Sequence, residues 1–220
     1  MILCGDSAQA IAAAVRALAA GELVGIPTET VYGLAANADD DAAVARIFFA
    51  KGRPSDHPLI VHVASAASVP QFASSVPAFA QSLMDAFWPG PLTLILPRRP
   101  EAAGAAAGGQ DSIGLRCPLH PVAQALLQAC AEAGIAGLAA PSANRFGRVS
   151  PTTAAHVQDE LGQELLILDG GACSVGIESS IVDCTRGQPV LLRPGVLTRA
   201  QLEAVTAGTV LARDAALAQG

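Results

Sequence analysis

The chain has 220 residues, of which 51% are hydrophobic and 15% charged, and its formal net charge at pH 7 is −6. The high hydrophobic fraction excludes a disordered chain, and this length can bury one large core without disulfides or metals. The sequence contains 13 Lys and Arg residues and 19 Asp and Glu residues. This balance argues against a protein that mainly coats nucleic acid, because affinity for a phosphate backbone needs a broad basic surface.

The first half of the chain alternates predicted helices and strands. Apolar spacing predicts a helix between Ser7 and Gly21, a second from Asp39–Asp41 to Lys51, and a third over Val76 to Trp88. Predicted strands cover Leu23–Ile26, Leu59–Val63, Leu92–Leu96 and Ile113–Arg116. The Ala- and Gly-rich segment Glu101–Asp111 has no periodicity, so we expect a loop there, with a hypothetical role as a lid.

In the second half, helices are predicted over Val122–Ala133, from Thr152 to Leu161 and from Thr198 onward. Predicted strands cover Leu138–Ala140, Leu165–Leu168, Ser180–Val182 and Val190–Leu192. The last three strands leave little room for helical crossovers, so we expect a mixed sheet in an α/β fold.

The expected organisation is one domain over residues 1–205 and a tail over residues 206–220. The five cysteines are an odd number without a C-x-x-C pair, which favours reduced thiols over a disulfide framework or a zinc ribbon. No run of about 18 apolar residues and no basic-then-apolar signal peptide is present. We therefore expect a soluble cytoplasmic protein without membrane contact.

Four polar clusters follow the ends of predicted strands, where α/β proteins usually bind ligands. They are Pro27–Leu34, Lys51–Pro54, Pro141–Asn144 and Glu178–Ser180, the last with Arg193–Gly195 beyond it. The chain contains neither a P-loop nor a G-x-G-x-x-G fingerprint. Any nucleotide must therefore be held in another way.

Lys51 and Arg53 flank Gly52, which suits two cations on one face of an extended segment with close backbone approach to a ligand. Hydroxyl and amide groups that could join them on a polyphosphate are Ser142, Asn144 and Ser150. The alternative is that Lys51 caps its helix and Arg53 makes a surface ion pair.

Three further residues allow two interpretations each. His62, inside an apolar strand, is either a core histidine with a satisfied hydrogen bond or a ligand contact. Glu29 and Glu178 either cap the backbone or bind a metal or an amine. A Ser-His-Asp hydrolase is disfavoured because the chain has no G-x-S-x-G elbow.

The order and spacing of these segments resemble the YrdC/TsaC family, the threonylcarbamoyl-AMP synthases. The resemblance covers about residues 7–200. Its motifs are Gly25–Leu34, Lys51–Pro54 with Pro58–His62, Ala140–Asn144 with Ser150–Thr152, and Glu178–Asp183 with Leu192–Gly195.

The resemblance implies a twisted mixed sheet with flanking helices, a YrdC-like fold, and a concave, locally positive cavity. The implied reaction joins L-threonine, bicarbonate or CO2, and ATP, with Mg²⁺ accompanying ATP, into L-threonylcarbamoyladenylate and pyrophosphate. The product would feed threonylcarbamoyladenosine modification of tRNA, completed by partner proteins, with tRNA itself binding at most weakly. We expect no metal site made by the protein alone.

The resemblance also implies site residues. Lys51 and Arg53 would act in catalysis by stabilising the charge of the leaving group. The ATP site would be formed by Lys51, Arg53, His57, Ser112, Ser142, Asn144, Ser150 and Arg193. The threonine site would be formed by Thr30, His62, Arg116, Ala140 and Ser179. Arg116 would hold the α-carboxylate, because a guanidinium matches a carboxylate with a planar fork.

The sequence departs from the family pattern at His57, where Asn is frequent, and at Ser180, where Thr is frequent. We expect the short, single-domain form of the family. Two alternatives stay open at this point: a relative that transfers a carbamoyl group through an adenylate, and a non-catalytic RNA-binding module, against which the net charge of −6 argues.

Overall fold

The computed structural model describes residues 1–213. Its strands are β1 (Ile2–Cys4), β2 (Val24–Ile26), β3 (Gly33–Asn37), β4 (Ile60–His62), β5 (Leu92–Pro97), β6 (Ser112–Arg116), β7 (Leu138–Ala139), β8 (Leu166–Asp169), β9 (Ser180–Asp183), β10 (Val190–Arg193) and β11 (Leu211–Ala212). Its helices are α1 (Ala8–Ala19), α2 (Asp41–Lys51), α3 (Val69–Phe72), α4 (Ala78–Phe87), α5 (Pro121–Glu132), α6 (Ala154–Leu161) and α7 (Arg199–Thr206), with a 3₁₀ turn η1 (Ala66–Ser68).

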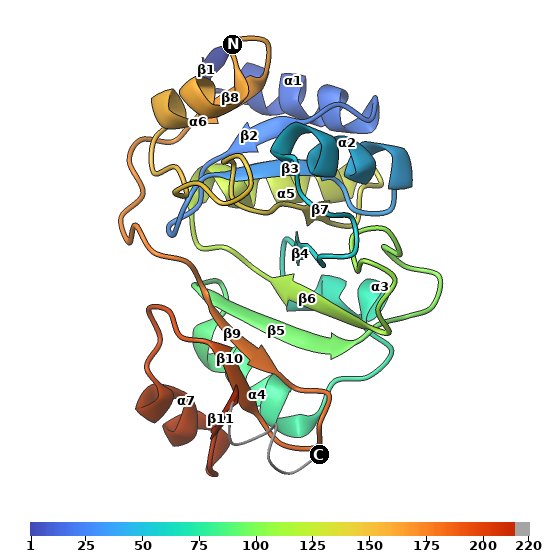
Figure 1. The fold of residues 1–220 in the computed structure, drawn as a ribbon, viewed down its shortest axis with the longest axis vertical. Coiled ribbons are helices and arrows are strands. Elements are labelled where there is room, and N and C mark those ends of the chain that lie inside the picture. The colour runs from blue at the N-terminus through green and yellow to red at the C-terminus, as the bar shows by residue number, and fades with distance from the viewer. Residues whose placement is uncertain (214–220) are drawn as a thin grey trace.

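The strands form one sheet in the order β1-β8-β2-β3-β7-β4-β6-β5-β9-β10-β11. Figure 1 shows them following one another down the long axis of the molecule, from β1 near the N-terminus to β11. Strand β4 pairs in parallel with β6, and β5 pairs in parallel with β9, whereas β5 and β6 are antiparallel. The predicted mixed sheet in an α/β fold is therefore confirmed.

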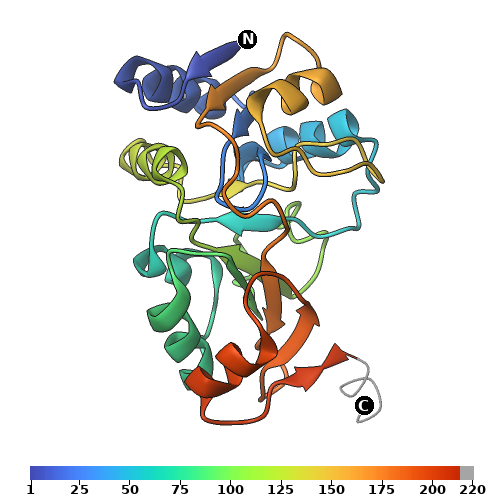
Figure 2. The same ribbon diagram turned by 90° about the vertical axis from the view of Figure 1, so that its left-hand side faces the viewer.

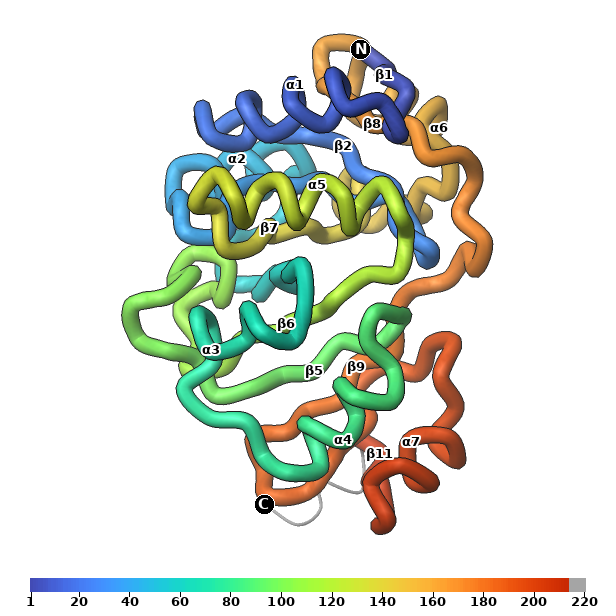
Figure 3. The backbone as a smooth tube through the Cα atoms, turned by 180° about the vertical axis from the view of Figure 1, so that it is seen from behind, coloured from blue at the N-terminus to red at the C-terminus, as the bar shows by residue number. Residues whose placement is uncertain are grey.

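Helices cover both faces of the sheet. Figure 3 shows α1, α5 and α4 in front of the strands, whereas α2 and α6 lie on the opposite face, toward the viewer in Figure 1. The side view in Figure 2 separates the two helical layers. Buried apolar side chains of α1 and α5 pack against β2 and β8 in one cluster, and a larger cluster joins the remaining elements.

The helix boundaries follow local signals in the sequence. The side chain of Asp40 accepts hydrogen bonds from the backbone N–H groups of Ala42 and Ala43, and so caps the start of α2. The helix ends at Gly52, whose φ of 62° lies in the left-handed region that glycine adopts without strain. His120 caps α5 ahead of Pro121, a residue tolerated in the first turn of a helix.

Every helix and strand predicted from the sequence is present with small shifts at its ends, but β1, β3, α3 and β11 were missed. The sequence of β3, Gly-Leu-Ala-Ala-Asn, lacks β-branched residues, and the strand is nearly all buried, so no alternation marks it. Strand β11 pairs in parallel with β10 inside the segment expected to be a tail. The rest of that segment, residues 214–220, lies outside the described residues.

The segment Glu101–Asp111 contains no helix or strand, as predicted. It is nonetheless anchored to the domain, because the backbone N–H of Leu59 donates to the carbonyl of Ala106 at 2.7 Å and the N–H of Ala103 donates to Asp39 at 2.9 Å. Several of its alanines are buried. None of the helices among residues 1–213 is both long and apolar enough to cross a membrane.

Candidate functional site

A cavity of about 310 Å³ lies over the middle strands of the sheet. This volume is at the lower end of the range of small-molecule sites, about 300–1,000 Å³. Its polar and charged lining residues come from seven separate stretches of the chain: Thr28, Arg53, His62, Thr93, Gln110, Ser112, Arg116, Ser142, Glu178, Ser179 and Arg193. The sheet therefore brings together side chains that are far apart in the sequence.

A row of buried polar side chains crosses four adjacent strands at one end of the cavity. In the strand register, Arg116 on β6 lies opposite both His62 on β4 and Thr93 on β5. The hydroxyl groups of Thr93 and Ser179, just before β9, lie 2.8 Å apart. Opposite residues of paired strands point to the same face, so the pairing of β4, β6 and β5 aligns His62, Arg116 and Thr93. Ser179 joins this row because it lies two residues before Ile181, which is opposite Thr93.

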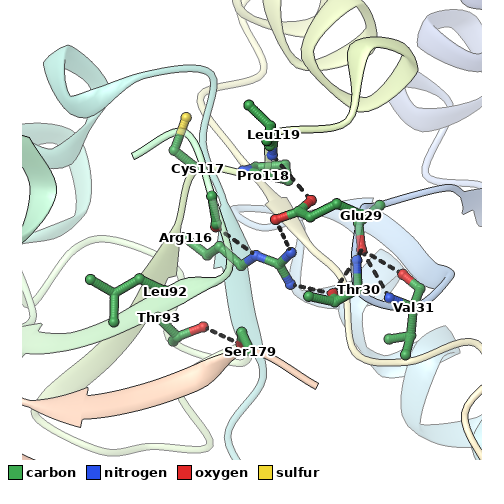
Figure 4. Close-up of polar contacts among 12 residues, drawn as sticks. Glu29, Thr30, Val31, Leu92, Thr93, Arg116, Cys117, Pro118, Leu119 and Ser179 are labelled. Carbon is green, nitrogen blue, oxygen red and sulfur yellow. Dashed lines mark hydrogen bonds and ion pairs between the residues drawn. The ribbon is translucent and has the colours of Figure 1, made fainter. Parts of the chain in front are cut away.

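The guanidinium of Arg116 is the centre of a buried network (Figure 4). Its Nη2 donates to Glu29 Oε1 at 2.6 Å, and its Nη1 donates to the hydroxyl of Thr30 at 2.9 Å. Each terminal nitrogen carries two N–H groups, so one N–H on each remains free of hydrogen bonds to the described residues. The other carboxylate oxygen of Glu29 accepts from the backbone N–H of Leu119 at 3.1 Å.

His62 is a neutral polar group of this end. Burial, together with the nearby charge of Arg116, lowers the pKa of His62 to about 3. Its Nδ1 has no hydrogen-bond partner among the described residues. An orphaned buried ring nitrogen in a cavity wall is a group that a ligand can satisfy.

Arg53 and Arg193 define what is called here the cationic end of the cavity. Arg53 and Arg193 both line it, and burial lowers the pKa of each guanidinium from its usual value. Arg53 donates to the carbonyl of Pro58 at 3.1 Å, while its buried Nε has no partner among the described residues. Arg193 is held by the backbone carbonyl and the hydroxyl of Ser179, each at 3.0 Å.

Glu178 is the one carboxylate among the residues that line the cavity in the described chain. It accepts a hydrogen bond from the hydroxyl of Ser150 at 2.7 Å and pairs with Arg193 at 3.4 Å. Two groups expected to bind a nucleotide are therefore occupied by a carboxylate of the protein itself.

Lys51 does not line the cavity. Its ammonium donates to the backbone carbonyls of Ser142 and Asn144, so it fixes the loop that follows β7. Burial, reinforced by the nearby charge of Arg53, lowers the pKa of Lys51 to about 8. The left-handed Gly52 separates Lys51, in the last turn of α2, from Arg53. The interpretation of Lys51 to Arg53 as one extended segment is therefore wrong.

Two further predicted ATP contacts, Asn144 and His57, do not line the cavity. Asn144 donates to the carbonyls of Arg145 and Arg148, both at 2.8 Å, and its side-chain oxygen is buried without a partner among the described residues. The exposed His57 packs at a tilt against Phe146, with ring centroids 5.8 Å apart.

Eight of the thirteen predicted ligand-site positions line the cavity: Arg53, His62, Ser112, Arg116, Ala140, Ser142, Ser179 and Arg193. Thr30 is bonded to the lining residue Arg116 and Ser150 to the lining residue Glu178. Asn144 and Lys51 do not line the cavity, and the ammonium of Lys51 donates to the carbonyl of Asn144. His57, a further predicted ATP contact, does not line the cavity. Sequence reasoning missed Thr93 as part of the site, since a threonine in an apolar strand carries no signal until strand register places it beside Arg116.

No group of three or more His, Cys, Asp or Glu side chains suited to hold a metal ion occurs among residues 1–213. Glu178 is the carboxylate that the cavity offers. Protein-bound Mg²⁺ commonly uses one or two carboxylates together with phosphates of the substrate.

Comparisons with known proteins agree with this geometry. A family model described as telomere recombination, Sua5/YciO/YrdC, matches residues 16–195. The chain is 48% identical over 197 residues to the threonylcarbamoyl-AMP synthase of Bacillus subtilis, covering 89% of this chain and 56% of that protein. It is also 48% identical over 186 residues to the enzyme of that name from Pyrococcus abyssi, covering 84% of this chain and 54% of that protein.

A solved structure of P. abyssi Sua5 complexed with L-threonine superposes with a TM-score of 0.86 and 42% identity, covering 94% of this chain and 60% of that one. The chain thus spans about half the length of these curated relatives. The match of the family model over most of the chain, together with the shared fold, shows that the chain belongs to the Sua5/YciO/YrdC family and has its YrdC-like fold.

Proposed function

We propose that this chain is a threonylcarbamoyl-AMP synthase, which joins L-threonine, bicarbonate or CO2, and ATP into L-threonylcarbamoyladenylate and pyrophosphate. The observation that carries the proposal is the two-ended cavity. A polar end with Arg116, His62 and Ser179 is continuous with a cationic end that contains Arg53 and Arg193. Such a cavity suits an amino acid beside a polyphosphate.

The names of the relatives support the proposal. The matched proteins of B. subtilis and P. abyssi are threonylcarbamoyl-AMP synthases, and the P. abyssi Sua5 structure contains L-threonine. The two free N–H groups of Arg116 suit the threonine α-carboxylate, and the orphaned nitrogen of His62 suits its hydroxyl. Thr30, Ala140 and Ser179 complete the proposed threonine site.

The proposed reaction has two bond-forming steps. The unprotonated amine of threonine attacks the carbon of CO2 with release of a proton to solvent, or the carbon of bicarbonate with loss of water, and gives a carbamate. A carbamate oxygen then attacks the α-phosphorus of ATP, and pyrophosphate leaves in line. Neither step needs a protein nucleophile, so the work of the site is positioning and charge stabilisation.

The residues of the cationic end would stabilise the leaving pyrophosphate. Arg53 and Arg193 supply the charge, and Ser112, Ser142 and Ser150 supply hydroxyl groups. Lys51 holds the backbone of residues 142–144 in place, and we propose that its remaining N–H serves the phosphates. Mg²⁺ is proposed to enter with ATP as part of the substrate, because protein-bound Mg²⁺ commonly uses phosphates of the substrate together with one or two carboxylates.

The proposed product is a reactive mixed anhydride, so a downstream protein that transfers it to tRNA is the expected partner, with tRNA binding this chain at most weakly. We also propose the cytoplasm as its compartment. All five cysteines are free thiols, which is typical of a reducing environment.

The decisive experiment measures pyrophosphate release while threonine, bicarbonate and MgATP are omitted in turn, and identifies the adenylate by mass spectrometry. We expect release only when all three are present. Release that continues without threonine would exclude this function.

A further inference from the structure

Glu29 is a buried carboxylate that has no part in the proposed reaction. It is 6% exposed, it does not line the cavity, and both of its oxygens are bonded within the described residues. Figure 4 shows it on the far side of the Arg116 guanidinium from the polar row of Thr93 and Ser179. A buried carboxylate in this position acts on a ligand through its charge.

The ionic groups of this network, Arg116 and Glu29, sum to zero. Arg193, which donates to the hydroxyl of Ser179 at 3.0 Å, is paired with Glu178 at 3.4 Å, so this second pair adds no net charge. Arg116 carries one positive charge, and Glu29 carries one negative charge at 2.6 Å from it. His62 adds none at neutral pH, because burial and Arg116 lower its pKa to about 3. Thr30, Thr93 and Ser179 contribute hydroxyl groups alone.

We propose that Glu29 is a specificity-determining residue, which balances Arg116 so that this end of the cavity accepts a zwitterionic α-amino acid and rejects carboxylates that lack an amine. The inference rests on the proposed function and deepens it, since it assigns a basis for choosing the amino-acid substrate. Arg116 would otherwise be an unpaired buried cation, and such a cation attracts any small anion.

This selectivity would arise because a zwitterionic amino acid carries two opposite charges, whereas a carboxylate without an amine carries a single negative charge. Glu29 repels the carboxylate of a bound amino acid and attracts its ammonium, and these effects largely cancel. For an anion without the ammonium only the repulsion remains. At separations of several ångströms and an effective dielectric constant near 20, this repulsion is enough to change affinity by about tenfold or more.

The test compares binding of L-threonine with binding of 3-hydroxybutyrate, which is threonine without its amine, by calorimetry on the whole chain. In Glu29→Gln we expect affinity for 3-hydroxybutyrate to rise about tenfold or more, while affinity for threonine changes by less than about threefold. Glu29→Asp keeps the charge and should keep the selectivity of the unaltered protein. Glu160→Gln is the matched control, because Glu160 pairs with Arg148 and does not line the cavity.

If Glu29 only supports the local structure, Glu29→Gln weakens both ligands by the same factor, and that result overturns the inference. An unchanged ratio of the two affinities overturns it as well. If the unaltered protein does not bind threonine, the proposed function fails, and this inference fails with it.

Arg116→Gln provides a second test if Glu29→Gln does not fold. This variant leaves the charge of Glu29 unbalanced, so affinity for L-threoninamide, a cation without the carboxylate, should exceed its value in the unaltered protein by about tenfold. If Arg116→Gln only removed the contact of Arg116 with the ligand carboxylate, the affinity for L-threoninamide would not increase. A threoninamide affinity that stays equal or falls therefore refutes the charge balance.

Discussion

Lys51 is the only lysine in the sequence, which makes its charge state directly measurable. It is 3% exposed, and its pKa is lowered from the usual 10.5 to about 8, chiefly by burial. Each pKa unit corresponds to about 1.4 kcal/mol, so the charged form of Lys51 is less stable in the folded protein than in the unfolded chain by about 3 kcal/mol. We predict that this difference appears in the pH dependence of the free energy of unfolding.

The direction in which the free energy of unfolding changes with pH follows from the number of protons that each state binds. Below pH 8 Lys51 is protonated in both states, and its unfavourable contribution is fully present. Between about pH 8 and 10.5 the unfolded chain binds the proton and the folded protein does not, so stability rises with pH. Above pH 10.5 Lys51 is neutral in both the folded and the unfolded state, and stability no longer changes through this group.

Other groups titrate in the same window, so the measurement needs a matched variant. Burial raises the pKa of Cys184 to about 12, for example, which makes its contribution fall with pH. Lys51→Met keeps the length of the side chain and removes the titration. The unfolding free energy of the unaltered protein minus that of Lys51→Met, measured in urea from pH 7 to 10.5, should rise by about 3 kcal/mol.

Carbon-13 labelled lysine gives an independent measurement, since one side-chain resonance should titrate near pH 8 in the folded protein and near 10.5 in urea. A flat or falling stability difference, with a folded midpoint near 10.5, would refute the reasoning. Added pyrophosphate tests the proposed ATP contact. If Lys51 faces the phosphates the folded midpoint moves upward, and a fixed midpoint would remove Lys51 from the proposed ATP site.

Three further predictions address the cavity. Arg53→Ala should reduce pyrophosphate release at least a hundredfold with little change in thermal stability, because its Nε lacks a protein partner; activity within threefold of the unaltered protein would contradict its role. Valine in place of threonine should support at least a hundredfold less pyrophosphate release, because buried polar groups at His62 and Ser179 would lose a partner; comparable turnover would exclude the proposed threonine site. Glu178→Gln should tighten binding of pyrophosphate severalfold by freeing Arg193; weaker binding would show that Glu178 assists the ligand.

Much of the fold was readable from local signals. Gly21, Asp40 and Pro121 mark helix ends through hydrogen bonding and backbone conformation that depend on neighbouring residues alone. Short apolar runs predicted most strands, and β3 escaped because its small residues carry no strand preference. The clusters at the strand ends also gave most of the lining of the cavity, since strands of one sheet end at shared edges.

The sequence by itself determined which residue types are available and, to within a few residues, where most helices and strands begin and end. The tertiary structure alone decided which of those residues meet: Arg116 with Glu29, 87 positions away, Thr93 with Ser179, and Lys51 with the carbonyls of residues 142 and 144. The physical reason is that a buried polar group must find a partner, and the order of the strands, with the loops and helices that follow them, brings that partner in from distant parts of the chain. The local sequence patterns used to predict helices and strands do not indicate which distant residues become hydrogen-bond partners.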